Sequence, residues 1–534
     1  MKRTNSRRRL KGSRRSPLEI GDGITPISTD PSVNAELTIL LRRKKSIPAS
    51  VVAALGRRPP LRRKYLEREE LAGLYGADPA DMAAVESFAA RYGLSITGRS
   101  SSRRAVTVSG RVSDISEAFE VDLRQYRSSD GVFLARNGPA SVPKHLSDVI
   151  VGVFGLDNRL QARPHFFDSA GQMTGDSTSP TPTDIADLYD FPSALNGAGE
   201  CIAIIEFGGG IDSNDLAAFF GNAQPTLRGP ILVDGAEDRP GLSEVAEVTL
   251  DICVAGAIAP AASIVVYIAP PTERGWIDAL GAAIHDDTNK PGIISISWGW
   301  PETSTQTNNP FWTKAGIGAI NELLKEAALL GITVCCSSGD SGSNADANGL
   351  LRVDFPASSP YVLACGGSTV EPNAEGPKTE SVWNVGAGGA SGGGFSGSMR
   401  IPTWQSVPAS LKQNASGRGI PDVAGFASGY RIHLSVPGFR SLGGTSAAAP
   451  LWAGLLTRIN EKLRNRVGYI NPIIYEALQN GAPQSSAFAP FHDIVHGNNR
   501  TNGSNKYDAI GGWDPCTGWG RPDGVQLMNL LAGQ

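Results

Sequence analysis

The chain has 534 residues, more than one compact core accommodates, so we expect at least two domains, one of them large. Basic and acidic residues nearly balance, with 49 Lys and Arg against 52 Asp and Glu and a formal charge of −3. No run of about 20 apolar residues occurs, which argues against a membrane-spanning helix. Residues 16–30 are polar and broken by Gly and Pro, unlike the apolar stretch of a secretion signal.

Positive charge is concentrated at the start of the chain. The first 15 residues contain eight Lys or Arg and no acidic residue. Such a segment can bind nucleic acid or an anionic surface, but a solvated tail is the commoner outcome. We therefore expect residues 1–33 to form a basic flexible tail that has no nucleic-acid partner.

A small α+β domain is predicted over residues 34–165. Strand and helix patterns alternate through it, with strands expected at 37–41, 104–108 and 132–136 and helices at 79–92, 112–119 and 144–151. Periodicity alone does not indicate what this domain does. Residues 166–182 follow and are rich in Ser, Thr, Pro and Gly, so we expect an exposed linker that is easily cut by a protease.

The remaining residues, 183–534, read as a large α/β domain. Continuous apolar runs typical of parallel strands covered on both faces occur at 201–205, 263–268, 293–297 and 332–336. Helical stretches between them indicate a mostly parallel sheet. Ligands bind such sheets beyond the carboxyl ends of the strands, and Glu206, Trp298 and Asp340 stand at those ends.

The stretch 443–450, Gly-Gly-Thr-Ser-Ala-Ala-Ala-Pro, has the features of a nucleophile at the start of a buried helix. Two glycines allow a sharp turn and a close approach to substrate, and Ser446 lies where helical amide donors are still unpaired. The alternative is that Thr445 or Ser446 only caps the helix.

A serine nucleophile needs a base. None of the six histidines lies in a glycine-rich helix start, whereas Glu247 and Asp251 are four residues apart, on one face of an apolar helical stretch. Two like charges at this spacing repel each other, more strongly where solvent is excluded. Glu247 could accept the serine proton while Asp251 orients it; a solvated acidic face is the alternative.

Asp340 lies in a Ser-Gly-Asp-Ser-Gly turn after a buried strand. It could be a plain turn residue. If it faces Ser446, its protonated carboxyl group could donate a hydrogen bond to a developing oxyanion, and activity would then require acid.

Five motifs occur in the order found in one known family: Glu-Val-Thr-Leu-Asp, Ser-Ile-Ser-Trp-Gly, Gly-Asp-Ser-Gly, Gly-Thr-Ser-Ala-Ala-Ala-Pro and Gly-Trp-Asp-Pro-Cys-Thr-Gly. The chain thereby resembles the sedolisins, or serine-carboxyl peptidases, and their kumamolisin branch in particular. The likeness covers residues 183–530. It implies a subtilisin-like α/β domain with a mostly parallel sheet, preceded by a small α+β, ferredoxin-like activation prodomain at 34–165.

The resemblance also assigns roles to residues. It implies that Ser446 is the nucleophile, Glu247 the general base, Asp251 its partner and Asp340 the acid of the oxyanion hole. It further implies that Glu206 and Trp298 support the acidic pair by hydrogen bonds and that Asp354 lies in the substrate cleft, where it favours basic or polar side chains.

A single calcium ion is the cofactor that the resemblance implies. Two carboxylates, Asp493 and Asp514, and three backbone carbonyls, those of Ile494, Ile510 and Gly512, would form the cage of hard oxygen ligands that calcium prefers. Considered without the family, the two aspartates are more typical of turn residues.

These observations predict an acid-active, calcium-stabilised serine-carboxyl endopeptidase, made as an inactive precursor that processes itself within residues 166–182. We expect a secreted monomer that acts on proteins or peptides and is inhibited by its own prodomain. An ordinary Asp-His-Ser subtilisin is the rival within enzymes. A catalytically silent binding protein on the same fold is the rival from another class.

Overall fold

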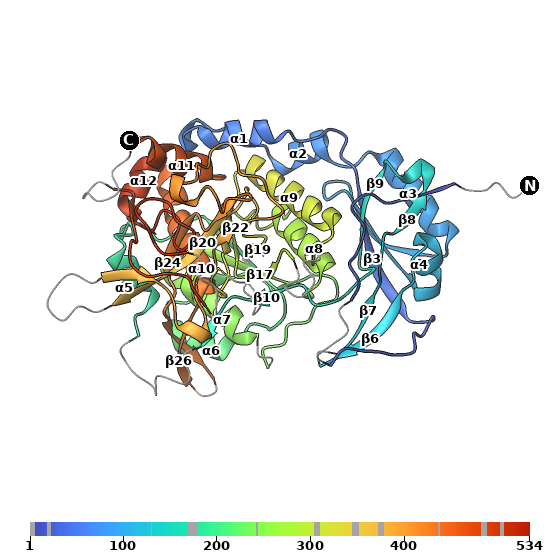
Figure 1. Cartoon of the computed structure of the whole chain (residues 1–534), viewed down its shortest axis with the longest axis horizontal. Helices are drawn as coiled ribbons and strands as arrows, with labels where there is room; N and C mark the ends of the chain where they lie inside the picture. The colour runs from blue at the N-terminus through green and yellow to red at the C-terminus, as the bar shows by residue number, and fades with distance from the viewer. Residues whose placement is uncertain are drawn as a thin grey trace, which may run out of the picture.

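The computed structural model describes residues 6–18, 23–129, 131–168, 179–241, 244–303, 310–343, 352–371, 379–435, 438–481, 489–501 and 507–534. Figure 1 shows a small N-terminal domain on the right, in blue and cyan, beside a larger domain that holds the rest of the chain. We call them the prodomain and the catalytic domain. No helix of the described part is long and apolar enough to span a bilayer.

The prodomain is ferredoxin-like, as predicted. Its sheet has the order β4-β5-β3-β9 with antiparallel neighbours, and α3 and α4 share the apolar core of that sheet. The elements in chain order are β3 (Asn34–Leu41), α3 (Pro79–Arg91), β4 (Ser95–Ser100), β5 (Ala105–Arg111), α4 (Val112–Phe119) and β9 (Ile150–Phe154). Helix α3 begins where expected, because Asp78 caps it and Pro79 fixes the first helical residue.

Two expectations for this region were wrong. Residues 144–151 are not a helix: a short 3-10 turn, Lys144–Leu146, is followed by edge strand β9, where pairing with β3 overrides the local helical pattern. The basic tail is also not flexible over residues 6–18. Strand β1 (Arg7–Arg9) pairs with β8 (Ser141–Pro143), and the 2%-exposed Arg15 lies 3.6 Å from carboxylate oxygens of Asp157 and Glu273.

The catalytic domain is built on a mostly parallel sheet. Its strands run in the order β13-β15-β12-β16-β18-β20-β21, with β24 also parallel to β20; the outermost strands are β13 (Thr226–Leu227) and β21 (Thr379–Val382). The central strands are β15 (Ser263–Ile268), β12 (Cys201–Glu206), β16 (Ile293–Ile296), β18 (Thr333–Ser337), β20 (Leu363–Glu371) and β24 (Val423–Phe426). Helices α7 (Val245–Ile258) and α10 (Thr445–Leu463) pack on each other and on this sheet. All six cysteines are buried free thiols.

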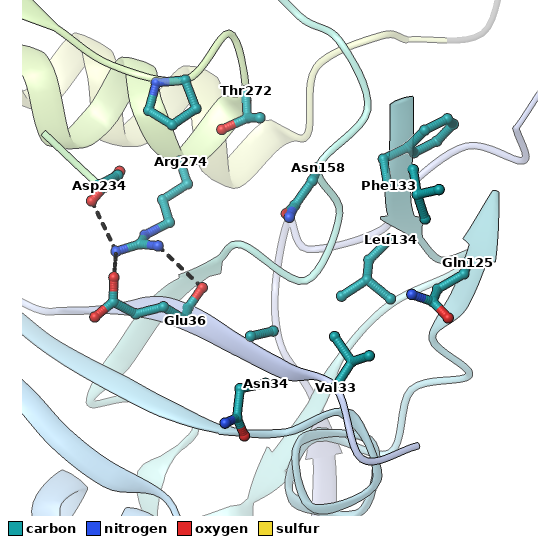
Figure 2. Close-up of a pocket in the computed structure, with 13 residues that line it drawn as sticks. Val33, Asn34, Glu36, Gln125, Phe133, Leu134, Asn158, Asp234, Thr272 and Arg274 are labelled. Carbon is teal, nitrogen blue, oxygen red and sulfur yellow. Dashed lines mark hydrogen bonds and ion pairs between the residues drawn. The ribbon is translucent and has the colours of Figure 1, made fainter. Parts of the chain in front are cut away.

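The prodomain sheet docks on two helices of the catalytic domain, α8 (Glu273–Ile284) and α9 (Lys314–Leu329), which contact β3 and β9 respectively. Charged side chains bridge the domains beside a cavity of about 340 Å³ (Figure 2). There the Arg274 guanidinium lies 2.8 Å from a carboxylate oxygen of Glu36 in the prodomain and 2.8 Å from one of Asp234 in the catalytic domain. Specific ion pairs thus hold the prodomain in place.

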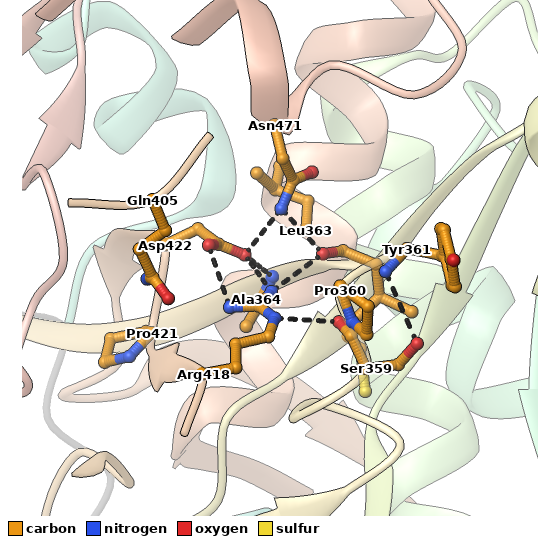
Figure 3. A network of polar contacts seen from close by, with 12 residues as sticks. Ser359, Pro360, Tyr361, Leu363, Ala364, Gln405, Arg418, Pro421, Asp422 and Asn471 are labelled. Carbon is orange, nitrogen blue, oxygen red and sulfur yellow. Dashed lines mark hydrogen bonds and ion pairs between the residues drawn. The ribbon is translucent and has the colours of Figure 1, made fainter. Parts of the chain in front are cut away.

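A buried ion pair braces strand β24 of the central sheet. Arg418 and Asp422, neither exposed to solvent, lie 2.8 Å apart, and Asp422 also accepts hydrogen bonds from Ala364 N and Asn471 Nδ2 (Figure 3). The remaining Arg418 donors reach backbone carbonyls, including that of Ser359. Because both charges are fully satisfied, the network ties β24 rigidly to β20.

Candidate active site

Ser446 is the second residue of helix α10. This helix begins directly after strand β26 (Gly438–Gly443) and the single residue Gly444. Gly444 has φ +88°, a conformation that residues with a side chain rarely adopt. The turn brings Ser446 to the buried first turn of the helix, where its hydroxyl donates a 3.1 Å hydrogen bond to Ser297 O. The sequence-based placement of Ser446 at a helix start is therefore confirmed.

Three carboxyl groups lie close to one another beneath this serine. Glu247 and Asp251 come from helix α7 and Glu206 from the end of β12, and all three side chains are 0% exposed. Burial, followed by the charge of Asp251, raises the pKa of Glu206 and of Glu247 well above the usual range, and burial does the same for Asp251. Burial and mutual repulsion therefore oppose full ionisation of the cluster. A solvated acidic face is excluded.

Two donors hold the outer members of this cluster. Ser297 Oγ donates to Asp251, at 2.8 and 2.7 Å from its two oxygens, and Trp298 Nε1 donates to Glu206 Oε2 at 2.8 Å. Neither Glu247 oxygen has a hydrogen-bond partner among the described residues. The Ser446 hydroxyl interacts with the Glu247 carboxyl group and opposes the rise of the Glu247 pKa. Glu247 is thus free to accept the Ser446 proton.

Asp340 faces the start of α10 from the turn after β18. Thr445 donates to Asp340 Oδ1 twice, from its backbone N at 2.8 Å and from Oγ1 at 2.7 Å, whereas Oδ2 is buried and has no partner among the described residues. An acid proton would accordingly be carried by Oδ2. Burial raises the pKa of Asp340 to about 6, although His165, Thr445 and Arg163 oppose the rise.

The end of the prodomain passes directly over Ser446. Strand β10 (Arg163–Pro164) pairs antiparallel with β17 (Trp298–Pro301), and β11 (Phe167–Asp168) pairs antiparallel with β26. Between them, the carbonyl oxygen of His165 accepts a 2.8 Å hydrogen bond from Ser446 N. The chain is therefore held across Ser446 in an extended conformation, like a peptide strand.

Gly444 makes this convergence possible. A Cβ atom added there would lie 2.4 Å from both Asp340 Oδ2 and the His165 carbonyl oxygen. Both atoms thus border the space that a side chain would fill. Asp340 Oδ2 and Ser446 N can consequently face one carbonyl oxygen, as an oxyanion hole requires.

Asp354, at the start of β19 (Asp354–Phe355), receives the side chains of the overlying segment. Its Oδ2 lies 2.9 Å from His165 Nε2 and 3.4 Å from an Arg163 guanidinium nitrogen, and His165 Nδ1 lies 2.8 Å from Ser337 Oγ. Burial alone would raise the pKa of Asp354, but Arg163 and His165 together hold it below its usual range. Asp354 therefore binds Arg163 and His165 of the overlying segment.

The segment that lies over Ser446 was not predicted from the sequence. His165 was set aside as a base with the other histidines, because none lies in a glycine-rich helix start, and its ring does face Asp354 and Ser337 rather than Ser446. The available signal was Pro164 and its neighbours. Proline favours an extended chain, and Arg163 and His165 on either side of it suit an acidic pocket. The expected processing region overlaps residues 169–178, which lie outside the described residues.

Far along the chain, Asp493 and Asp514 lie near each other. Asp514 Oδ1 accepts backbone hydrogen bonds from Cys516 N at 2.8 Å and Thr517 N at 2.9 Å, and Asp493 Oδ2 accepts one from Gly512 N at 2.7 Å. Burial is the main cause that raises the pKa of Asp514 to about 7. Hydrogen bonds from backbone amides oppose this rise, and the charge of Asp493 adds to it. Asp493 Oδ1 is buried and has no hydrogen-bond partner among the described residues, as expected of an oxygen that binds a cation.

Protein side chains alone do not complete a metal cage. Within the described ranges, no group of three or more His, Cys, Asp or Glu side chains is placed to hold a metal ion. A cation between Asp493 and Asp514 would accordingly depend on backbone carbonyls as well, of which those of Ile494, Ile510 and Gly512 are the candidates from the sequence analysis.

Comparison with known proteins places both domains. Residues 27–159 match the family model described as "Pro-kumamolisin, activation domain", and residues 243–513 match the subtilase family. Kumamolisin from Bacillus sp. (strain MN-32) is 42% identical over 97% of this chain and 94% of its own length. Sedolisin from Pseudomonas sp. (strain 101) is 28% identical over 88% of this chain and 82% of its own length.

A solved structure agrees. Pseudomonas sedolisin, described as a serine-carboxyl proteinase complexed with two molecules of pseudo-iodotyrostatin, superposes with a TM-score of 0.56 at 29% identity. The superposition covers 67% of this chain and 100% of that one. The predicted fold class, a subtilisin-like domain behind an activation prodomain, is thereby confirmed.

Proposed function

Because the chain belongs to the sedolisin family of serine-type peptidases, we propose that it is an acid-active serine-carboxyl endopeptidase made as a self-processing precursor. One observation carries this proposal: Ser446 lies buried among carboxyl groups, and by hydrogen-bond geometry the Glu247 oxygens and Asp340 Oδ2 have no partner among the described residues. An ordinary subtilisin would need a histidine as base, and the His165 ring is engaged with Asp354 and Ser337 instead.

In the proposed mechanism, Ser446 Oγ bonds to the substrate carbonyl carbon while its proton passes to Glu247. Asp251, held by Ser297, favours the protonated form of Glu247. The oxygen that becomes negative receives hydrogen bonds from Ser446 N and from the protonated Asp340 Oδ2. When the tetrahedral intermediate collapses, the peptide C–N bond breaks and Glu247 returns the proton to the leaving amine. Water then releases the acyl group by the reverse sequence.

This mechanism predicts activity in acid. Asp340 donates only while protonated, and its pKa of about 6 means that the donor is lost as pH rises through 6. Hydrolysis of a peptide by the processed enzyme should therefore be measurable at pH 4–5 and decline above about pH 6. Absence of hydrolysis at every pH would instead favour the silent binding protein.

We propose that the first self-processing cut falls between His165 and Phe166. Ser446 N already donates to the His165 carbonyl oxygen, and strands on both sides hold the segment extended. This bond borders the residues expected for processing, 166–182. The prodomain occupies the active site until the cut is made, which explains how it would inhibit the enzyme.

The earliest cleavage product should begin at Phe166. We expect amino-terminal sequencing of the precursor, sampled during the first minutes in acid, to give Phe-Phe-Asp. His165→Pro should delay this cut strongly, because proline removes the side chain that reaches Asp354. Tyr92→Phe, a distant prodomain change, should process normally. A first product beginning elsewhere would refute the assignment.

We also propose that one calcium ion binds between Asp493 and Asp514, with the carbonyls of Ile494, Ile510 and Gly512 completing the cage. The support is the unpaired Asp493 Oδ1 and the proximity of two buried acids. When bound, calcium would stabilise the C-terminal loops of the domain.

Removing calcium should lower the melting temperature of the processed enzyme. A ligand that binds only the folded state stabilises it by mass action, so at 100 times Kd the loss on chelation is about 2.7 kcal/mol. Asp493→Asn should abolish the response to calcium. It is a cleaner variant than Asp514→Ala, because asparagine at 493 can still accept the hydrogen bond from Gly512 N, whereas alanine at 514 leaves the Cys516 and Thr517 amides without that acceptor. A melting temperature indifferent to calcium would remove this site.

The remaining properties follow from the family. We propose secretion, a monomeric state, and proteins or peptides as substrates. Nucleic-acid binding is not proposed; within the basic stretch, Arg7 and Arg15 form ion pairs inside the chain.

A further inference from the structure

Strand β26, which leads to Ser446, carries an arginine that meets the segment lying over the active site. The Arg440 guanidinium forms an ion pair with Asp168 through Nη2. Asp168 is the third residue after the His165–Phe166 bond and the last described residue before the gap in the linker. The contact therefore lies on the leaving-group side of that bond.

The strand pairing fixes this contact. Phe167 lies opposite Gly443 and Asp168 opposite Leu442 in the β11–β26 ladder. The Phe167 ring packs edge-on against Trp383, with ring centroids 5.9 Å apart. Asp168 thus reaches Arg440 from a segment whose register is set by backbone hydrogen bonds and by the aromatic contact before it.

The Arg440 guanidinium group can bind a carboxylate. Its side chain is 25% exposed, so solvent screens the charge only in part. Its Nε is buried and has no hydrogen-bond partner among the described residues, although Nη2 is engaged by Asp168. A guanidinium with one donor in use and a second available can hold both oxygens of a carboxylate.

We propose that Arg440 selects substrates with an acidic side chain at the third position after the scissile bond. This inference rests on the proposed peptidase function and on the linker occupying the site as substrate does. It adds a recognition element on the leaving-group side to the Asp354 contact on the acyl side. In the precursor, this subsite is occupied by Asp168 of the Phe-Phe-Asp sequence with which the linker begins.

The test compares three peptides that contain Arg-Pro-His-Phe-Phe-Xaa, with Asp, Asn or Lys as the last residue. Assays at pH 5 keep the aspartate ionised, because its usual pKa is about 3.9, and keep Asp340 mostly protonated. For the parent enzyme, kcat/KM should be about two- to fivefold higher for Asp than for Asn, the scale of a partly exposed ion pair, and lowest for Lys.

Charge reversal sharpens the comparison. Arg440→Glu should invert the order, so that the Lys peptide is cleaved faster than the Asp peptide. Arg431→Glu is the matched control: it makes the same charge change on the neighbouring strand β25 (Tyr430–Leu434), where Arg431 lies over the Phe439 ring. This control should keep the parental order.

The full-length chain provides a second arm. Asp168→Lys should slow the first self-cleavage, and adding Arg440→Glu should restore it. If the parent cleaves none of the peptides, the peptidase proposal itself fails. If it cleaves all three equally, or if Arg440→Glu keeps the parental order, the peptidase stands and the role of Arg440 is refuted.

Discussion

A Ser446→Ala precursor should remain intact at about 56 kDa after incubation in acid, because the atom that attacks the peptide bond is missing. The substitution removes one oxygen from a buried site and keeps the helix start formed by Gly444 and Thr445, so the fold should persist. Turnover of added peptide should fall on the order of a million-fold, the scale seen when a catalytic unit of this kind loses its nucleophile.

Ser295→Ala is the control for this experiment. Ser295 is a buried serine two residues before Ser297, and its hydroxyl has no hydrogen-bond partner among the described residues. This variant should mature like the parent. Maturation of purified Ser446→Ala without added protease would show that another residue is the nucleophile.

Glu247→Gln and Asp251→Asn should each lower turnover by several orders of magnitude. Glu247→Gln removes the proton acceptor, and Asp251→Asn removes the negative charge that favours its protonation. Since the two groups act as one base, the double variant should be only slightly slower than the worse single variant. The measurement is kcat/KM for one peptide, with each variant processed in trans by the parent enzyme.

The control is again a conservative change of a buried residue. Glu302→Gln alters a buried acid held by Ser358 and Ser396, away from Ser446, and should affect stability more than turnover. Full additivity of the Glu247 and Asp251 losses, expressed as free energies, would mean that the two residues act independently.

Much of the site was predictable because its residues sit in local motifs. The helix start at Ser446, the i, i+4 acids of α7 and the turn at Asp340 each have a recognisable local pattern, and parallel strands bring their carboxyl ends to one edge of the sheet. Periodicity located the central strands, and the ferredoxin-like prodomain followed from the family resemblance.

What could not be predicted depends on contacts between distant segments. Nothing in the local sequence shows that His165 lies over Ser446, that Ser297 holds Asp251, or that Arg440 meets Asp168. The helix predicted at 144–151 was wrong for the same reason, since its last two residues begin strand β9, which pairs with the distant strand β3. Arg7 and Arg15 looked solvated because their carboxylate partners lie more than 100 residues away.

The measurement that most directly tests the account is the pH dependence of kcat/KM for the parent and for Asp340→Asn. The parent's activity should fall as pH rises through about 6, where Asp340 loses its proton. An asparagine keeps a neutral donor that does not ionise, so the variant, although slower, should lose this alkaline limb and remain active towards neutral pH. If the variant's activity falls at the same pH as the parent's, another group controls the limb and Asp340 is not the oxyanion acid.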